Sequence, residues 1–313
     1  VSLRGTSPSL TQTLINGHNV GTGDWFVLSQ VQTVGRSVSY SLLPAEIVSR
    51  VVVHKGSEAK IAEGGSAGSV NIITRRPLQF ADPMTIEGTV GGVYSDLPGE
   101  TKPQINALFN WKNDAGTAGI LFQGFYEKRG LRRDGQEVVG GYNAIAATDA
   151  VATTNPDLVG VLYPNLIGST LFEQERERKG AVLDIQVKAT DNLTLGLNAF
   201  YSKLEADNFN RNYMLWNSRY VPHIAPAAGY TVSNGVLTNA SYAPITDPAV
   251  MCGTVACVNT PFGVYDQISR PNASSDSRYI ALDADWQVTD NFGLTFQAGQ
   301  SEGHGKSPTQ DVI

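Results

Sequence analysis

From Met84 onward the sequence alternates apolar and polar residues over long segments, and this alternation restricts the possible fold more than any other feature. In MTIEGTVGGVYS, the apolar residues Met84, Ile86 and Val90 fall on one face of an extended chain. The segments QINALFNW and AGILFQGFYEK continue the same pattern. A period of two residues is that of a β-strand with two unlike faces. This part of the chain is therefore predicted to form an antiparallel β-sheet.

One hairpin sequence occurs twice. AVLDIQVKATDNLTLGLNAFYS begins at Ala181, and IALDADWQVTDNFGLTFQAG begins at Ile280; their Leu-Asp pairs are 99 residues apart and both carry the turn Thr-Asp-Asn. Asp184, Lys188 and Asp283 fall on one face of these strands, and the opposite face has no charge. Together with the preceding segments, the repeat predicts seven strands of about 9–13 residues each.

The predicted strands are joined by connections of very unequal length. The connections after the second, fourth and sixth strands are NDAG, TDN and TDN, whereas those after the third and fifth are about 45 and 70 residues long. Short turns on one side and long loops on the other are typical of an outer-membrane β-barrel, whose apolar residues face lipid. A soluble β-sandwich is the alternative, in which the apolar faces pack against each other.

Composition and charge exclude several functional classes. The 313-residue chain has a formal net charge of −6 and no basic run, so no nucleic-acid partner is expected. It has no run of 18 apolar residues that would predict a transmembrane helix. The glycine-rich stretch at 64–68 lacks the Gly-Lys-Ser/Thr ending of a phosphate loop. The four histidines show neither metal-ligand nor catalytic-triad spacing, so no enzyme activity, metal or cofactor is expected: His18, His54, His223 and His304.

The two cysteines, Cys252 and Cys257, lie close together in MCGTVAC. No histidine lies near them to complete a metal site. We predict a local disulfide between them, which implies an oxidising compartment or the cell surface.

Residues 1–78 follow a different pattern. Asn16-Gly17 is a strong turn signal after a short strand. Pro44 and Glu46 mark a helix start, and the β-branched run 51–53 follows. SVNIITRRP predicts another strand, ended by Pro77. A small α/β domain is predicted here.

The order of these motifs resembles the second half of the plug domain of TonB-dependent receptors. The resemblance rests on VSLRG, LINGHNV and LPAEIVSRVVVHKGSEAKIAEGGSAGSVNIITRRP. It departs from the usual pattern where Ser49 and Val52 replace glutamates, Ser57 replaces a proline, and Ile61-Ala62 replaces a Tyr-Gly pair. This variant looks most like a branch of the family that is often associated with oligosaccharide uptake.

The resemblance implies a mainly β protein with two parts. Residues 1–78 would be the C-terminal part of the plug, and residues 79–313 the N-terminal part of a transmembrane β-barrel in the cell outer membrane of a Gram-negative bacterium. About seven of an expected 22 or so barrel strands would be present, so we expect the chain to be an excerpt of a longer protein. A TonB-type energy-transducing complex would act through a segment preceding Val1, and the barrel would contact outer-membrane lipid.

The cargo implied by the resemblance is a scarce nutrient, with an oligosaccharide as the first expectation. A ferric siderophore, haem or cobalamin is the alternative within the family. A surface or soluble carbohydrate-binding β protein is the alternative of another class. No catalytic residue is implied by any of these readings.

The resemblance also implies roles for individual residues. Gly64, Gly65, Gly68 and Asn71 belong to the plug motif, where glycine permits tight turns and close approach to the barrel wall. Arg4 and Lys55 are expected to pair with glutamates of later barrel strands; ordinary solvated side chains are the alternative.

Aromatic and polar residues in two segments suit a sugar, whose ring has apolar faces and a hydroxylated rim. They are Asp24, Trp25 and Phe26 in the plug, and Arg211, Tyr213, Trp216 and Tyr220 in the longest predicted loop. Packing inside the plug, the loop or an aromatic girdle is the alternative for the aromatic residues.

Overall fold

The computed structural model describes residues 3–7, 10–23, 39–56, 58, 61, 64–227, 229–243 and 263–312. Most of them lie in strands, which form a four-stranded sheet near the N-terminus and a large sheet that is almost entirely antiparallel. The mainly β fold class predicted from the alternation is therefore confirmed. In the described ranges, no helix is both long and apolar enough to cross a membrane.

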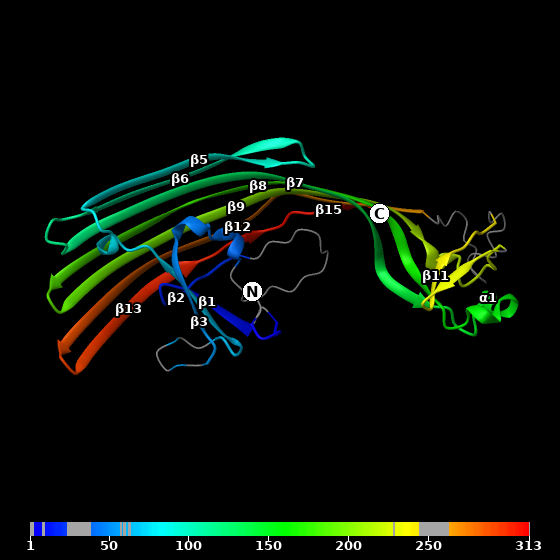
Figure 1. The fold of residues 1–313 in the computed structure, drawn as a ribbon, viewed down its shortest axis with the longest axis horizontal. Coiled ribbons are helices and arrows are strands. Elements are labelled where there is room, and N and C mark those ends of the chain that lie inside the picture. The colour runs from blue at the N-terminus through cyan, green and yellow to red at the C-terminus, as the bar shows by residue number, and fades with distance from the viewer. Residues whose placement is uncertain are drawn as a thin grey trace. The chain divides into compact units, whose positions relative to one another are not determined.

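Seven long strands follow one another across the large sheet in sequence order (Figure 1). They are β5 (Met84–Ser95), β6 (Glu100–Lys112), β7 (Ala118–Ala144), β8 (Leu162–Thr190), β9 (Leu193–Trp216), β12 (Gly263–Thr289) and β13 (Phe292–Glu302). Four short strands attach to this path: β10 (Thr231–Ser233), β11 (Val236–Asn239), β14 (Gly305–Lys306) and β15 (Gln310–Val312). The seven predicted strands are confirmed, and the sheet is open, with β5 and β13 at the ends of the path.

Three tight turns lie together at one end of the large sheet, on the left in Figure 1. They comprise residues 113–117, 191–192 and 290–291. The Lys188 N–H donates to the Thr117 carbonyl at 2.7 Å, and the Gln287 N–H donates to the Asn192 carbonyl at 2.8 Å. Each bond joins a turn to the end of the neighbouring strand, and the predicted short-turn side of the sheet is confirmed.

The predicted strand length was wrong for four of the seven strands. β7, β8, β9 and β12 contain 27, 29, 24 and 27 residues. Many of the extra residues lie in polar or charged stretches that carry no apolar alternation, such as RRDGQE and FEQERERK. Strand pairing needs only backbone hydrogen bonds, so a strand continues where both of its faces are polar. The long connections are correspondingly shorter than predicted.

The described residues form two compact units. The first unit contains residues 1–131, 174–208 and 270–309, and the second contains residues 132–173, 209–269 and 310–313. The four longest strands contribute residues to both units. The bounds of these compact units differ from the predicted boundary at residue 78. The division into a plug part (1–78) and a barrel part (79–313) stays a prediction.

The predicted apolar face of the large sheet is exposed in the first unit. Ile86, Phe109 and Phe122 lie opposite one another on β5, β6 and β7, and they are 71%, 40% and 51% exposed. We call this surface the apolar belt. Its other large members are Met84, Val90, Tyr94, Ile105, Trp111, Val187, Leu195, Tyr201, Ile280, Leu282, Trp286, Leu294 and Phe296.

The four-stranded sheet has the order β2-β1-β4-β3. Its strands are β1 (Thr11–Ile15), β2 (His18–Asn19), β3 (Val48–His54) and β4 (Gly68–Thr74). Asn16 and Gly17 join β1 and β2 with φ values of 52° and 86°, so the predicted turn is confirmed. The helix predicted after Pro44 was wrong, because that segment forms only the 3-10 turn η3 (Ala45–Ile47) before β3 begins. Two further 3-10 turns, η2 (Tyr40–Leu42) and η4 (Pro77–Gln79), flank this region.

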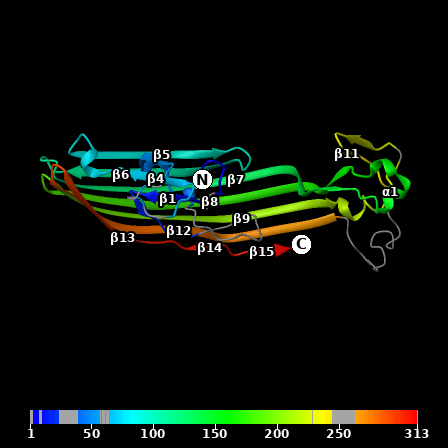
Figure 2. The ribbon, with the colours of Figure 1, turned by 90° about the horizontal axis from the view of Figure 1, so that it is seen from below.

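The four-stranded sheet packs on the face of the large sheet opposite the apolar belt. Ile15, Ile47 and Ile72 from the N-terminal region contact a cluster that the large sheet provides. That cluster consists of Phe125, Val182, Phe200, Tyr279 and Ala281. Figure 2 shows β1 and β4 lying against the strands of the large sheet. Polar residues of the large sheet are buried around this cluster, including Gln123, Asp184 and Asn198.

The second unit has a core of its own. Ile145, Val151, Leu158 and Val221 are at most 3% exposed, and Tyr163 and Leu237 pack with them. This core includes α1 (Ala150–Thr154) and the 3-10 turn η5 (Pro156–Leu158); the 3-10 turn η6 (Asn217–Arg219) follows β9. The connections between β7 and β8 and between β9 and β12 are therefore packed structures in their described parts.

Candidate functional site

Arg76 connects the N-terminal region to two aspartates of the large sheet. Its guanidinium lies 3.7 Å from the Asp184 carboxylate on β8 and 3.6 Å from the Asp283 carboxylate on β12. The side chains of Arg76, Asp184 and Asp283 are 16%, 0% and 10% exposed. His18 Nε2 lies 2.7 Å from the other oxygen of Asp283. Buried carboxylates of this kind persist only where a cation or hydrogen-bond donors compensate them, so Arg76 fixes the position of the N-terminal sheet.

Asn16 adds an uncharged contact beside this ion pair. Its amide nitrogen donates to Thr74 Oγ1 at 2.9 Å and to Asn198 Oδ1 on β9 at 3.2 Å, and its oxygen accepts the Thr74 N–H at 2.9 Å. Asn198 also donates to Asp184 at 2.8 Å. The Asn16-Gly17 turn is held from the other side by Asn71, whose side-chain oxygen accepts the Gly17 N–H at 3.0 Å. Asn71, a predicted plug-motif residue, thus positions the turn that carries Asn16 and His18.

Side chains of the large sheet also bind backbone carbonyls of the N-terminal region. Ser202 donates to the Leu42 carbonyl at 2.6 Å, Gln123 donates to the Glu46 carbonyl at 3.1 Å, and Arg178 donates to the Ser41 carbonyl at 3.1 Å. Segments that are not in strands need such partners, because a buried carbonyl without a donor is costly. This explains why the covered face of the sheet is polar although it is buried.

The cations predicted to contact the barrel, Arg4 and Lys55, are exposed side chains. No ion pair involving either of them is found among the described residues. Their expected partners belong to later strands, so their role stays a prediction. Sequence reasoning missed Arg76 and His18 as contact residues, although Arg76 stands in the same motif and Asp184 and Asp283 occupy equal positions of the repeated hairpin.

The predicted glycine patch forms a tight structure within the N-terminal sheet. Gly64 and Gly68 have φ values of +150° and +130°. A Cβ atom on Gly65 would lie 2.3 Å from the Gly68 carbonyl oxygen, and one on Gly68 would lie 2.5 Å from the His54 carbonyl oxygen. A side chain at Gly65 or Gly68 would therefore meet backbone of the N-terminal region and not the large sheet, and the role of these glycines beside the barrel wall stays a prediction. The patch closes the β3–β4 connection.

Gly68→Ala is expected to destabilise the N-terminal sheet by about 1–3 kcal/mol, because the added Cβ meets backbone at a strained φ. Gly56→Ala is the control, since a Cβ at Gly56 meets nothing within 4 Å, and a change within about 0.5 kcal/mol is expected. Hydrogen exchange of the β4 amides measures both effects. Equal protection in the two variants would contradict the assigned role of Gly68.

Four of the predicted ligand contacts lie in the second unit. Arg211 and Tyr213 are in β9, Trp216 ends β9, and Tyr220 follows η6. Tyr213 is 59% exposed and its ring centroid lies 5.0 Å from that of Tyr265. The Arg219 guanidinium lies over the Trp216 ring at 3.9 Å, and the Arg211 guanidinium lies over the Phe209 ring at 5.0 Å.

Tyr220 belongs to the core of the second unit. Its ring packs edge-on against Tyr242 with centroids 5.0 Å apart. Burial raises the pKa of Tyr220 to about 12 and that of Tyr242 to about 12 as well. The Tyr220 hydroxyl donates a hydrogen bond to Asn217 Oδ1. The remaining site predictions, Asp24, Trp25 and Phe26 and the disulfide between Cys252 and Cys257, lie outside the described residues.

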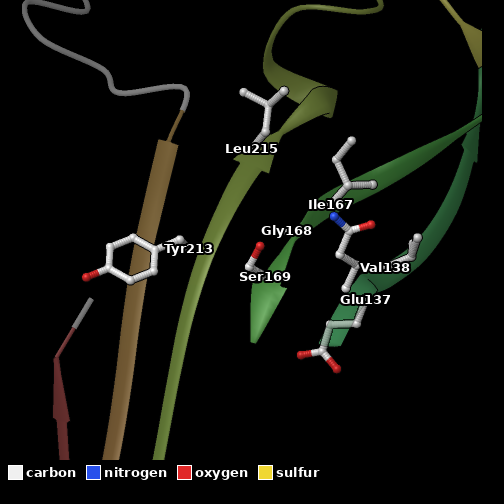
Figure 3. A pocket seen from close by; sticks show the side chains of 8 residues that line it. Glu137, Val138, Ile167, Gly168, Ser169, Tyr213 and Leu215 are labelled. Carbon is white, nitrogen blue, oxygen red and sulfur yellow. The ribbon is translucent and has the colours of Figure 1, made fainter. Parts of the chain in front are cut away.

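Tyr213 is one of the residues that line a hollow of about 550 Å³ (Figure 3). Val138 from β7, Ile167 from β8 and Leu215 from β9 provide apolar walls, and Gln136, Glu137 and Ser169 add polar groups. Gly168 lets β8 approach β9 here, because a Cβ at this position would lie 2.0 Å from the Tyr213 carbonyl oxygen. A hollow of this size and mixed lining suits a small amphipathic molecule or a sugar residue.

No protein-family model and no curated protein matches the chain. Among solved structures, the chain is similar to the siderophore receptor PiuA from Acinetobacter baumannii, with 9% identity and a TM-score of 0.30 over 99% of this chain and 56% of that one. A mutant of the ferric enterobactin receptor PfeA from Pseudomonas aeruginosa gives 10% identity and a TM-score of 0.32, over 98% of this chain and 51% of that one.

The pyoverdine outer membrane receptor FpvA from Pseudomonas aeruginosa PAO1 is a third similar structure. It gives 11% identity and a TM-score of 0.28, over 99% of this chain and 52% of that one. The chain spans about half the length of the solved structures it matches.

Proposed function

We propose that this chain is part of a TonB-dependent outer-membrane receptor that imports a scarce nutrient. One observation carries the proposal: the apolar face of the large sheet is exposed, whereas its polar face is covered by the N-terminal sheet. A water-soluble protein buries its apolar face and exposes its polar one. The reverse arrangement suits a sheet whose outer face contacts lipid and whose inner face encloses a plug.

The N-terminal sheet takes the role of the plug in this proposal. Its contacts with the large sheet combine a small apolar cluster with ion pairs and hydrogen bonds to backbone carbonyls. Such polar contacts can be exchanged for water when the plug is pulled, at a lower cost than exposing a large apolar interface. A TonB-type complex would supply the pull through a segment that precedes Val1, and transport would involve no covalent chemistry.

An oligosaccharide is the proposed cargo. Tyr213 offers an exposed aromatic face beside Gln136, Glu137 and Ser169, which supply hydrogen-bonding groups for hydroxyls. A ferric siderophore is the alternative that one observation favours, because two arginines stack on aromatic rings in the second unit and cations suit a charged iron chelate.

Binding measurements separate the two cargoes. The full-length receptor in detergent is titrated in a calorimeter with a panel of oligosaccharides and with a panel of ferric chelates. A heat of binding is expected with the oligosaccharides. Tyr213→Ala is expected to weaken sugar binding about tenfold, because loss of a stacked ring costs about 1.4 kcal/mol. Tyr142→Ala is the control, since Tyr142 is 54% exposed and is not among the residues that line the hollow. Binding of the chelates alone would replace the glycan assignment by the siderophore one.

A further inference from the structure

The apolar belt ends abruptly on three neighbouring strands. On β7 the outward face passes from Tyr126 to Lys128, and on β9 it passes from Tyr201 to Lys203. On β8 the same face passes from Ala181 to Lys179. Directly beyond this line, charged residues occupy outward positions on all three strands. We call the six residues Lys128, Glu175, Glu177, Lys179, Lys203 and Glu205 the charged band.

The charged band consists of two groups of ion pairs, one around Glu175 and one around Lys179 and Glu205. Lys128 pairs with Glu175 at 2.6 Å, Lys179 pairs with Glu177 at 2.8 Å, and Lys203 pairs with Glu205 at 2.6 Å. Lys179 also lies 3.5 Å from Glu205, which links β8 to β9. At the other side, Lys102 of β6 lies 2.9 Å from Glu175. Tyr126 joins the belt to the band, because its hydroxyl donates to Glu177 at 3.1 Å.

The distance of the band from the tight turns matches a bilayer. On β7, β8 and β9 about ten residues separate the band from the turns at 113–117 and 191–192. A β-strand of about 9–11 residues crosses the hydrocarbon core at a tilt of about 45°. With the turns at one surface of the membrane, the charged band therefore lies at the level of the headgroups of the opposite leaflet.

The composition of the band also fits the headgroup layer. Unpaired charges at the edge of hydrocarbon are costly, and here three lysines pair with three glutamates so that each has a partner. The side chains of Lys128, Lys179 and Lys203 are still 29%, 46% and 31% exposed. Ammonium groups on flexible chains extend toward an interface and bind phosphate there.

We propose that the charged band is the contact surface for the phosphate-bearing headgroups of a lipid bilayer, and that it sets the depth at which the sheet is inserted. The lysines bind the lipid phosphates, and the glutamates accept hydrogen bonds from headgroup ammonium groups. This inference rests on the proposed function, because it requires that the apolar belt lies in lipid.

Spin labels at three outward positions of β9 test the inference. The full-length receptor, with Cys252→Ser and Cys257→Ser, carries Leu197→Cys, Tyr201→Cys or Glu205→Cys and is placed in vesicles of phosphatidylethanolamine with phosphatidylglycerol. Oxygen is expected to relax the label at 197 most strongly, whereas a lipid with a nickel-chelating headgroup is expected to relax the label at 205 most strongly. Thr194→Cys, on the opposite face, is the control and should respond weakly to both.

The outcomes separate the two proposals. A label at 205 that responds to a water-soluble nickel chelate and not to the nickel lipid overturns the headgroup contact, while oxygen relaxation at 197 retains the membrane assignment. A label at 197 that responds like bulk water overturns both. Lys179→Gln with Lys203→Gln is expected to lower the nickel-lipid effect at 205 at least about twofold, because the ammonium groups that hold phosphate are lost. An unchanged effect would contradict the role of the lysines.

Discussion

Phe122→Arg is expected to destabilise the inserted protein by about 2–4 kcal/mol, which is the cost of placing an arginine at the middle of a bilayer on the lipid face of a strand. Phe122 lies near the centre of the apolar belt on β7, next to Phe109 on β6, and is 51% exposed. Urea unfolding in lipid vesicles measures the change. The fraction of the protein that inserts correctly in cells is also expected to decrease, as measured by heat-modifiable migration in gels.

Tyr142→Arg is the matched control for this substitution. Tyr142 is an aromatic residue of the same strand, with 54% exposure, but it lies in the second unit and beyond the belt. We expect an effect within about 0.5 kcal/mol there. If both variants were equally stable, Phe122 would face water and the belt would have no contact with lipid.

Arg76→Ala is expected to have the second large effect, a loss of about 3–5 kcal/mol in the stability with which the N-terminal sheet is held. The substitution leaves Asp184, whose side chain is fully buried, and Asp283 without their shared cation. Hydrogen exchange and limited proteolysis of residues 39–74 in the folded receptor measure the release of the N-terminal sheet from the large sheet.

The neighbouring arginine provides the control. Arg75 pairs with Glu87 at 2.9 Å, but the two side chains are 36% and 52% exposed, so Arg75→Ala is expected to cost at most about 1 kcal/mol. Adding Asp184→Asn to Arg76→Ala is expected to restore part of the protection, since it removes the uncompensated charge. Similar protection in the Arg75 and Arg76 variants would show that the ion pair does not hold the sheet.

The apolar alternation made the large sheet predictable. Ile86, Phe109 and Phe122 each belong to a row of apolar residues that recurs at every second position of its segment. The structure places the three residues opposite one another on β5, β6 and β7. The Asp-Asn and Asn-Gly turns were predictable for a similar reason, because few residues adopt the required backbone. Strand ends were not predictable, since a stretch such as ERERK pairs through its backbone without any apolar pattern.

The contacts between the two sheets depend on residues far apart in the sequence. His18 and Asp283 are separated by 265 positions, and no local pattern indicates that they meet. Arg76 lies in the SVNIITRRP motif, and Asp184 and Asp283 lie in the repeated hairpin. Their pairing, however, depends on how the N-terminal sheet packs on the large sheet. The hollow at Tyr213 is formed by three strands, so only Tyr213 itself was predicted from the sequence.

Quenching of tryptophan fluorescence by lipids with brominated acyl chains tests the central claim most directly. Within residues 1–313, a variant with Trp25→Phe and Trp216→Phe keeps only Trp111 and Trp286, which are 44% and 45% exposed on the apolar belt, and any tryptophan outside these residues is also replaced by Phe. In vesicles of brominated lipid, strong quenching and little effect of aqueous acrylamide are expected. Efficient quenching by acrylamide, with no effect of the bromine atoms, would contradict the claim that this face of the sheet contacts lipid.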